Sequence, residues 1–144
     1  MYATLGSIFD QTVSKFPNKE ALVDLKRGQR WTYGEWRDDV HRCANALTAA
    51  GVGKGDRVST FLFNTSELAT TLFACAKIGA IFNPINFRLK SEEVAYILND
   101  AMPKVVLFEE VLKDQVASIQ SQFPDTQFWF INEETPSFAK NYHE

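Results

Sequence analysis

A chain of 144 residues with 45% hydrophobic and 13% aromatic residues is typical of one globular domain and excludes a disordered or low-complexity protein. The formal net charge of −3 at pH 7 excludes the basic excess that phosphate-backbone binding needs, so no nucleic-acid partner is expected. Charged residues interrupt the first 20 positions, and no apolar run reaches the roughly 18 residues of a membrane-spanning helix, which predicts a cytoplasmic protein.

Helix-type and strand-type patterns alternate along the chain, with short polar turns between them. Thr32 and Glu35 fit a capping box, in which each side chain accepts a backbone N–H of the other residue. Asn64 and Ser91 are expected to cap two later helices, and Gly79 is placed to end one of them. The expected elements are helices at 5–16, 32–51, 64–78, 91–100 and 112–123, and strands at 21–25, 30–32, 57–63, 80–83, 104–108 and 127–131.

From residue 57 onward, strands and helices take turns with short connections. Such alternation favours parallel strands, because parallel neighbours need a crossover that a helix can supply. We therefore expect an α/β fold of three layers, a mostly parallel sheet with helices on both faces. One domain piece is expected over residues 1–131, and residues 132–144, which show no clear period, are expected to form a frayed tail.

Several patterns look like chemical sites but have simpler structural explanations. The run GVGKGD at residues 51–56 follows a helix and leads into a strand, the reverse of the order that a phosphate-binding loop requires, so it is interpreted as a turn whose first glycine ends a helix. With only two histidines, His41 and His143, neither a metal cluster nor a histidine-based triad is predicted. Cys43 and Cys75 have no metal-type spacing and are expected to be buried thiols.

Two further groups are interpreted in the same way. The adjacent carboxylates Glu109 and Glu110 are expected on a solvated helix face or at a helix start, since neighbouring side chains on a helix point in different directions. The aromatic run at residues 128–130 is typical of a core strand, although such rings could also stack on a ligand.

The corner after Pro84 has two interpretations. Pro84 stops a short strand, and ligands of open α/β sheets bind beyond the carboxyl ends of the strands. Asn83 and Asn86 offer amides, and Arg88 offers a planar cation suited to phosphate. In the structural alternative, the amides satisfy the loop backbone and Arg88 pairs with Glu92.

Five blocks occur in a definite order and spacing: WTYGEW at 31–36, GVGKGDRV at 51–58, AKIGA at 76–80, NPINFRL at 83–89 and KVVL at 104–107. Together they resemble the amino-terminal part of the adenylate-forming (AMP-binding) superfamily. The NFRL ending of the fourth block is closer to the fatty acyl-CoA synthetases of that superfamily than to its luciferase or peptide-synthetase branches.

The resemblance implies a parent acid-thiol ligase that uses ATP and Mg²⁺ to convert a carboxylate to an acyl-adenylate, then transfers the acyl group to coenzyme A. It also implies that Asn86, Phe87 and Arg88 lie near the coenzyme A nucleotide. The family's phosphate loop and catalytic lysine have no counterpart in this sequence, so no catalytic or metal-binding residue is predicted. The chain is expected to be an inactive amino-terminal scaffold piece that binds no cofactor tightly.

Its expected partners are the rest of the parent chain and, in the parent, a fatty acid or related carboxylate, with the substrate left open between fatty and aryl acids. We also expect self-association through surface that the rest of the parent would cover. The alternative from another class is a stand-alone nucleotide-binding, coenzyme A-binding or interaction module with the same fold.

Overall fold

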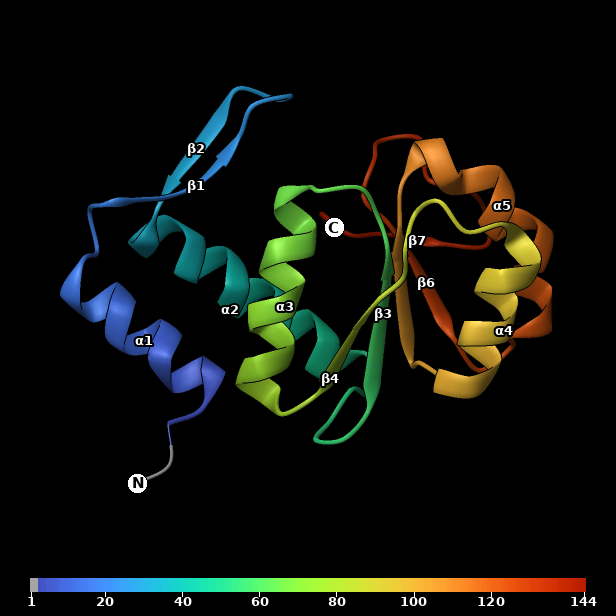
Figure 1. The fold of residues 1–144 in the computed structure, drawn as a ribbon, viewed down its shortest axis with the longest axis horizontal. Helices are drawn as coiled ribbons and strands as arrows, with labels where there is room; N and C mark the ends of the chain where they lie inside the picture. Colours follow the sequence, from blue (N-terminus) through green and yellow to red (C-terminus); the bar gives the residue numbers. More distant parts are fainter. Residues whose placement is uncertain (1–2) are drawn as a thin grey trace. The chain divides into compact units, whose positions relative to one another are not determined.

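A computed structural model describes residues 3–144 (Figure 1). The chain divides into two compact units. Unit 1 consists of Met1–Lys54 and Asn64–Ala80, and unit 2 consists of Gly55–Phe63 and Ile81–Glu144. The chain passes from unit 1 to unit 2 and back before it completes unit 2, so each unit is built from two stretches of sequence.

Unit 1 is helical with one hairpin, and an aromatic cluster lies at its centre. Phe9 packs edge-on against Trp36 at a centroid distance of 5.3 Å and stacks on Phe73 at 4.6 Å. The indole N–H of Trp36 donates to the Thr70 hydroxyl at 3.0 Å, which satisfies the polar atom of a buried ring. The elements of this unit are α1 Leu5–Lys15, β1 Glu20–Asp24, β2 Gln29–Thr32, α2 Tyr33–Ala49 and α3 Ser66–Ile78.

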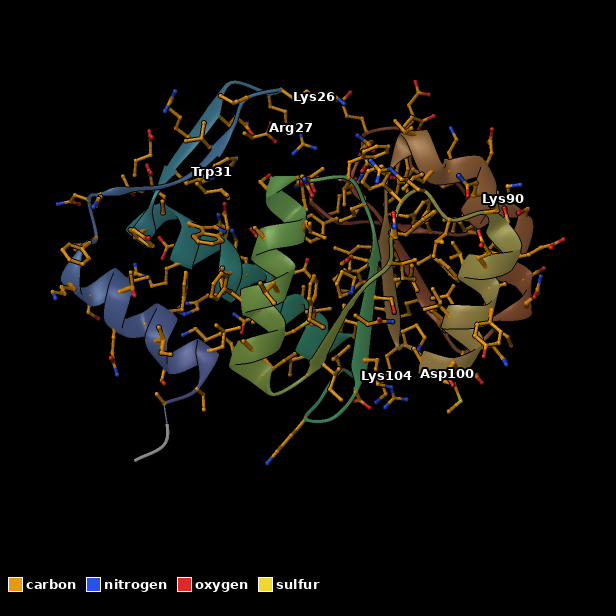
Figure 2. The ribbon with its side chains drawn as sticks, viewed as in Figure 1. Lys26, Arg27, Trp31, Lys90, Asp100 and Lys104 are labelled. Atoms are coloured by element: carbon orange, nitrogen blue, oxygen red, sulfur yellow. The ribbon has the colours of Figure 1, made fainter. Side chains whose placement is uncertain are left out.

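The antiparallel hairpin β1–β2 is attached to the start of α3 by an ion pair. Lys26 and Arg27 lie at its turn (Figure 2). The Arg27 guanidinium donates to the Glu67 carboxylate at 2.7 Å, and Glu67 is only 4% exposed. A buried carboxylate needs such a partner, because an unpaired buried charge would destabilise the fold strongly.

A capping box begins α2, and a glycine follows the end of α2 and of α3, as expected. Thr32 N–H donates to the Glu35 carboxylate at 2.8 Å, and Glu35 N–H donates to the Thr32 hydroxyl at 3.3 Å. Gly51 and Gly79 follow α2 and α3 with φ angles of 89° and 75°, in the left-handed region that favours glycine.

Two other predicted caps are wrong by one residue. Thr65, not Asn64, is extended before α3, and its hydroxyl accepts the N–H three residues on at 3.3 Å. Lys90 precedes α4, whose first helical residue is Ser91, and the Glu93 carboxylate accepts the Lys90 N–H at 2.8 Å. Both corrections follow from the backbone, because the cap is whichever residue is extended just before the first helical turn.

Unit 2 is an α/β unit around a parallel sheet with strand order β4-β3-β5-β6-β7. Helices α4 and α5 run side by side (Figure 1). The elements are β3 Arg57–Phe61, β4 Ile81–Pro84, α4 Ser91–Ala101, β5 Val105–Phe108, α5 Lys113–Ile119, β6 Gln127–Phe130 and β7 Lys140–Asn141, with short 3₁₀ turns at Glu110–Leu112 and Gln120–Gln122.

The core of unit 2 joins alternate residues of the strands to the inner faces of the two helices. This agrees with the interpretation of residues 128–130 as a core strand, since Phe128 and Phe130 lie in the cluster. Its buried members are Phe61, Ile85, Val94, Leu98, Val106, Phe108, Leu112, Val116, Ile119, Phe128 and Phe130.

The guanidinium of Arg57 closes the carboxyl end of α4. Its Nε donates to the Ala101 carbonyl at 2.6 Å, and its Nη2 donates to the Met102 carbonyl at 3.3 Å. Its Nη1 donates to the Gly55 carbonyl at 3.1 Å. The last carbonyls of a helix lack partners within the helix and carry partial negative charge, so a cation at this point stabilises the helix end.

The expected α/β class with a mostly parallel sheet is confirmed. The segment 132–144, where a frayed tail was expected, contains β7, which pairs in parallel with β6 through Trp129 with Lys140 and Phe130 with Asn141. A strand of this length leaves no periodic signature in the sequence, because its pairing depends on a neighbour rather than on its own pattern.

Candidate functional site

The carboxyl ends of the parallel strands of unit 2 meet at one edge of the sheet, where α/β proteins bind ligands. The loop after β4 carries Asn86, Phe87 and Arg88, the residues predicted from the sequence. Both Asn86 and Arg88 are exposed, whereas Ile85 just before them is 4% exposed and belongs to the core. The loop is therefore anchored at its start and presents its polar residues to solvent.

Backbone and side-chain hydrogen bonds hold the loop in a tight turn. Ile85 N–H donates to the Thr60 carbonyl of β3 at 2.8 Å, which extends the ladder one residue beyond Pro84. The Asn86 side-chain oxygen accepts the Arg88 N–H at 3.0 Å, and the Asn86 carbonyl accepts the Leu89 N–H at 3.1 Å. The Asn86 amide therefore stabilises the turn itself, as the structural interpretation expected.

Aromatic rings support the cation of this loop. Phe87 stacks on Phe63, which follows β3, with ring centroids 4.1 Å apart and ring planes 27° apart. The Arg88 guanidinium carbon lies 5.3 Å from the Phe87 ring centroid, within the range of a cation–π contact. The alternative pairing of Arg88 with Glu92 is not formed, and within residues 3–144 no acidic side chain forms an ion pair with Arg88.

Glu109 lies at the end of β5 on the same edge, and the sequence prediction for it is wrong. It is 5% exposed instead of solvated, and its carboxylate accepts the Phe63 N–H at 2.5 Å. Glu110, which is exposed, behaves as expected at a helix start, and its N–H donates to the Asn132 side-chain oxygen at 2.8 Å. The two neighbouring glutamates thus differ in exposure, because only Glu109 lies against the loop that follows β3.

The segment after β6 completes this edge with a network of amides. The Asn141 side-chain nitrogen donates to the Asn132 carbonyl at 3.0 Å and to the Thr135 hydroxyl at 2.9 Å. A ring nitrogen of His143 lies 3.2 Å from the Ile131 carbonyl. These contacts hold residues 141–143 against the segment that follows β6, so the polar groups of Asn141 and His143 have structural partners.

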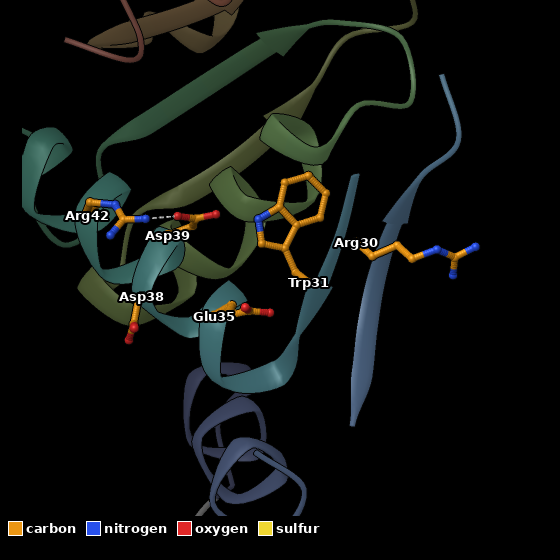
Figure 3. Close-up of a pocket in the computed structure, with 6 residues that line it drawn as sticks. All are labelled: Arg30, Trp31, Glu35, Asp38, Asp39 and Arg42. Atoms are coloured by element: carbon orange, nitrogen blue, oxygen red, sulfur yellow. Dashed lines mark hydrogen bonds and ion pairs between the residues drawn. The ribbon is translucent and has the colours of Figure 1, made fainter. Parts of the chain in front are cut away.

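A hollow in unit 1 is lined by many charged side chains (Figure 3). These charges are already paired. Arg30 donates to both Glu20 oxygens at 2.9 Å, and Arg42 pairs with Asp39. Hydrogen bonds from the Thr32 backbone and hydroxyl lower the pKa of Glu35, which keeps that carboxylate in its capping role. The hollow therefore offers less for a ligand than the edge of the sheet in unit 2. It is lined by Arg30, Trp31, Glu35, Asp38, Asp39 and Arg42.

The remaining sequence patterns take structural roles. Cys43 and Cys75 are free and buried, as expected, and burial raises the pKa of Cys75 to about 12, so its thiol is protonated at neutral pH. Among residues 3–144 no group of three or more His, Cys, Asp and Glu side chains is arranged to hold a metal ion. None of the helices in that part of the chain is long and apolar enough to cross a membrane.

The family described as "AMP-binding enzyme" matches residues 9–140. The long-chain-fatty-acid–CoA ligase FadD13 of Mycobacterium tuberculosis is 35% identical over 118 residues, covering 82% of this chain and 24% of that protein. A long-chain-fatty-acid–CoA ligase of Thermus thermophilus is 35% identical over 143 residues, covering 97% of this chain and 26% of that protein. The chain thus spans about a quarter of the length of these relatives.

Solved structures agree with this relationship. The N-terminal domain of FACL13 from Mycobacterium tuberculosis superposes with a TM-score of 0.84 at 32% identity, covering 90% of this chain and 34% of that domain. The anthranilate CoA ligase AuaEII, in complex with anthranoyl-AMP, superposes with a TM-score of 0.92 at 25% identity, covering 99% of this chain and 27% of that protein. Because the family match extends over nearly the whole chain and the fold agrees with that of these ligases, the chain belongs to the AMP-binding enzyme family.

Proposed function

We propose that this chain is an amino-terminal scaffold piece of an ATP-dependent acyl-CoA synthetase. The observation that carries the proposal is the match over residues 9–140 to the AMP-binding family, together with 35% identity to proteins named as long-chain-fatty-acid–CoA ligases. In the parent enzyme, a carboxylate reacts with ATP to give an acyl-adenylate and pyrophosphate, and the thiol of coenzyme A then displaces AMP to give the thioester. A fatty acid is the proposed substrate, and the parent is proposed to act in the cytoplasm.

Of the parent's three proposed cofactors, coenzyme A is the one for which the loop after β4 offers suitable side chains. Arg88 presents a guanidinium on an aromatic support, with no carboxylate of residues 3–144 paired to it, and such a group suits the phosphates of coenzyme A. Asn86 holds the turn, and Phe87 supports the cation. No comparable set of residues suits Mg²⁺ among residues 3–144, so we assign the chemistry of ATP and Mg²⁺ to the rest of the parent.

The coenzyme A contact can be tested with Arg88→Ala in the intact parent ligase. Removal of a charged hydrogen-bonding group costs about 1.5–3 kcal/mol of binding, so we expect KM for coenzyme A to rise at least about tenfold. KM for ATP and for the fatty acid should stay unchanged. Lys26→Ala, which removes an exposed cation at the hairpin turn of unit 1, is the matched control. An unchanged KM for coenzyme A in Arg88→Ala would remove this residue from the site.

The scaffold role predicts that the 144-residue chain alone makes no acyl-adenylate. Incubation with ATP, Mg²⁺ and fatty acids of several lengths, followed by detection of acyl-AMP, tests this directly. Formation of acyl-AMP above the level of a heat-denatured sample would contradict the proposal. If the chain forms no acyl-AMP but binds a nucleotide or coenzyme A with micromolar affinity, the alternative of a stand-alone binding module is favoured instead.

The proposed partner of the chain is the remainder of the parent ligase. Several large apolar side chains are more than 40% exposed, among them Leu5 at 48%, Ile8 at 49% and Phe16 at 43% on or next to α1. Exposed apolar surface of this kind favours association. We therefore expect the isolated chain to self-associate, and a monodisperse monomer in light scattering at high protein concentration would count against it.

A further inference from the structure

The edge of the sheet in unit 2 contains a buried carboxylate that the proposed coenzyme A contact does not use. Glu109 is 5% exposed, and its carboxylate accepts the backbone N–H of Phe63 at 2.5 Å. A charged side chain in this position is costly, because burial removes its hydration and a single neutral donor replaces little of it. An apolar residue could fill this buried position equally well, so packing does not explain why residue 109 is a glutamate.

The partner of Glu109 is the residue on which the loop after β4 rests. Phe63 comes two residues after the last residue of β3, where the ladder of the sheet no longer supplies an acceptor for its N–H. Glu109 provides that acceptor and so sets the backbone position of Phe63. The ring of Phe63 then stacks on Phe87 at 4.1 Å, and Phe87 lies under the Arg88 guanidinium at 5.3 Å.

Three successive contacts therefore join the buried carboxylate to the exposed cation. Each contact lies inside unit 2, and each restricts the next side chain. An arginine side chain that is fixed before binding loses less conformational entropy when it meets an anion, which improves affinity without a new contact.

We infer that Glu109 is a positioning residue, which holds Phe63 so that the Phe63–Phe87 stack presents Arg88 to an anionic ligand. This inference rests on the proposed function for the identity of the ligand, a phosphate group of coenzyme A. Glu109 itself does not touch the ligand, because it lies beneath the loop and is shielded from solvent.

The test compares three variants of the ¹⁵N-labelled 144-residue chain by NMR. Glu109→Ala removes the acceptor, and we expect the Phe63 amide to exchange with solvent about tenfold faster, as loss of its hydrogen bond implies. The Arg88 Nε–H signal should also move. Glu109→Gln keeps an acceptor oxygen in the same place and should restore both signals, which a role in carrying charge would not predict.

Phe87→Leu interrupts the series at its second contact and leaves the buried carboxylate untouched. It should move the Arg88 signal while the Phe63 amide stays protected, so it remains informative if Glu109→Ala fails to fold. An Arg88 signal that is unchanged in both Glu109→Ala and Phe87→Leu would overturn the inference.

Titration with coenzyme A, with pantetheine as the control that lacks phosphates, separates this inference from the proposed function. We expect coenzyme A alone to shift the Arg88 signal in the unsubstituted chain, at millimolar concentration, and Glu109→Ala to weaken that binding about fivefold or more. If coenzyme A does not shift the Arg88 signal, while the Phe63 and Arg88 signals of the variants change as expected, the proposed coenzyme A contact is refuted and the positioning role of Glu109 remains supported. A coenzyme A affinity equal in Glu109→Ala and the unsubstituted chain would overturn the positioning role.

Discussion

Replacement of Arg57 by alanine tests whether the GDRV stretch at residues 55–58 serves the fold instead of a ligand. The Arg57 guanidinium donates to the carbonyls of Ala101 at 2.6 Å, Gly55 at 3.1 Å and Met102 at 3.3 Å. The contact with Ala101 is short and partly buried, and it contributes about 1.5 kcal/mol as a charge-assisted bond. The cation at the end of α4 adds about 0.5 kcal/mol, and the two exposed contacts add little.

The expected loss for Arg57→Ala is therefore about 2 kcal/mol of the free energy of unfolding. With a urea m-value of about 2 kcal/mol/M, the midpoint of unfolding should fall by about 1 M. Circular dichroism during urea titration measures this shift, and hydrogen exchange at the amides of α4 identifies the affected element. Arg57→Lys should recover only part of the loss, because an ammonium cannot reach three carbonyls in the arrangement that the guanidinium matches.

Arg37→Ala is the matched control, since Arg37 pairs with the adjacent Asp38 and both side chains are about half exposed. Exposed ion pairs contribute little, so the control should change stability by less than about 0.5 kcal/mol. If Arg57→Ala also stays within that range, the contacts of its guanidinium do not stabilise the end of α4, and a ligand role for this arginine becomes the better explanation.

Three further outcomes follow from the local structure. The pKa of Glu35 is below its ordinary value of 4.5 because the Thr32 backbone and then its hydroxyl donate to the carboxylate. The ionised Glu35 therefore contributes its full stability at pH values above the pKa that Glu35 has in the unfolded chain. This contribution is lost as the pH falls through the lower pKa of Glu35 in the folded chain. Glu35→Gln removes this titration, so the free energy of unfolding should depend less on pH in that acid range. Gly79→Ala should cost about 1 kcal/mol in thermal or urea unfolding, because residue 79 has a φ of 75° and an added Cβ would lie 3.1 Å from Lys54 Cγ. The Cys75 thiol, whose pKa is about 12, should react with a thiol reagent at pH 8 at least about a hundredfold more slowly in the native chain than in urea, and equal rates would show that the site is open.

The sequence was sufficient for much of the local structure. The capping box of Thr32 and Glu35 was predicted correctly because its hydrogen bonds join residues three apart and depend on no distant part of the chain. The same holds for Gly51 and Gly79, since their left-handed conformations are requirements of the backbone. The parallel sheet could be predicted from the alternation of elements, which leaves few other topologies.

The candidate loop could be located but not described from the sequence. A proline at a strand end, with an asparagine on either side of it and an arginine after it, indicated where Asn86, Phe87 and Arg88 would lie. That Arg88 lies over Phe87 and does not pair with Glu92 depends on Phe63, which is more than 20 residues away in the sequence. Only the register of β3 with β4 brings these rings together.

Periodicity, caps and turn residues determined which elements form and that strands and helices alternate, because these signals act between residues a few positions apart. The tertiary structure decided which neighbours meet at the ends of the strands. It buried Glu109 beneath the loop after β3 while leaving Glu110 exposed, and it added β7 beside β6. Such contacts depend on the pairing of separate strands, so the environment of a side chain at a sheet edge is a property of the assembled sheet and cannot be read from its own stretch of sequence.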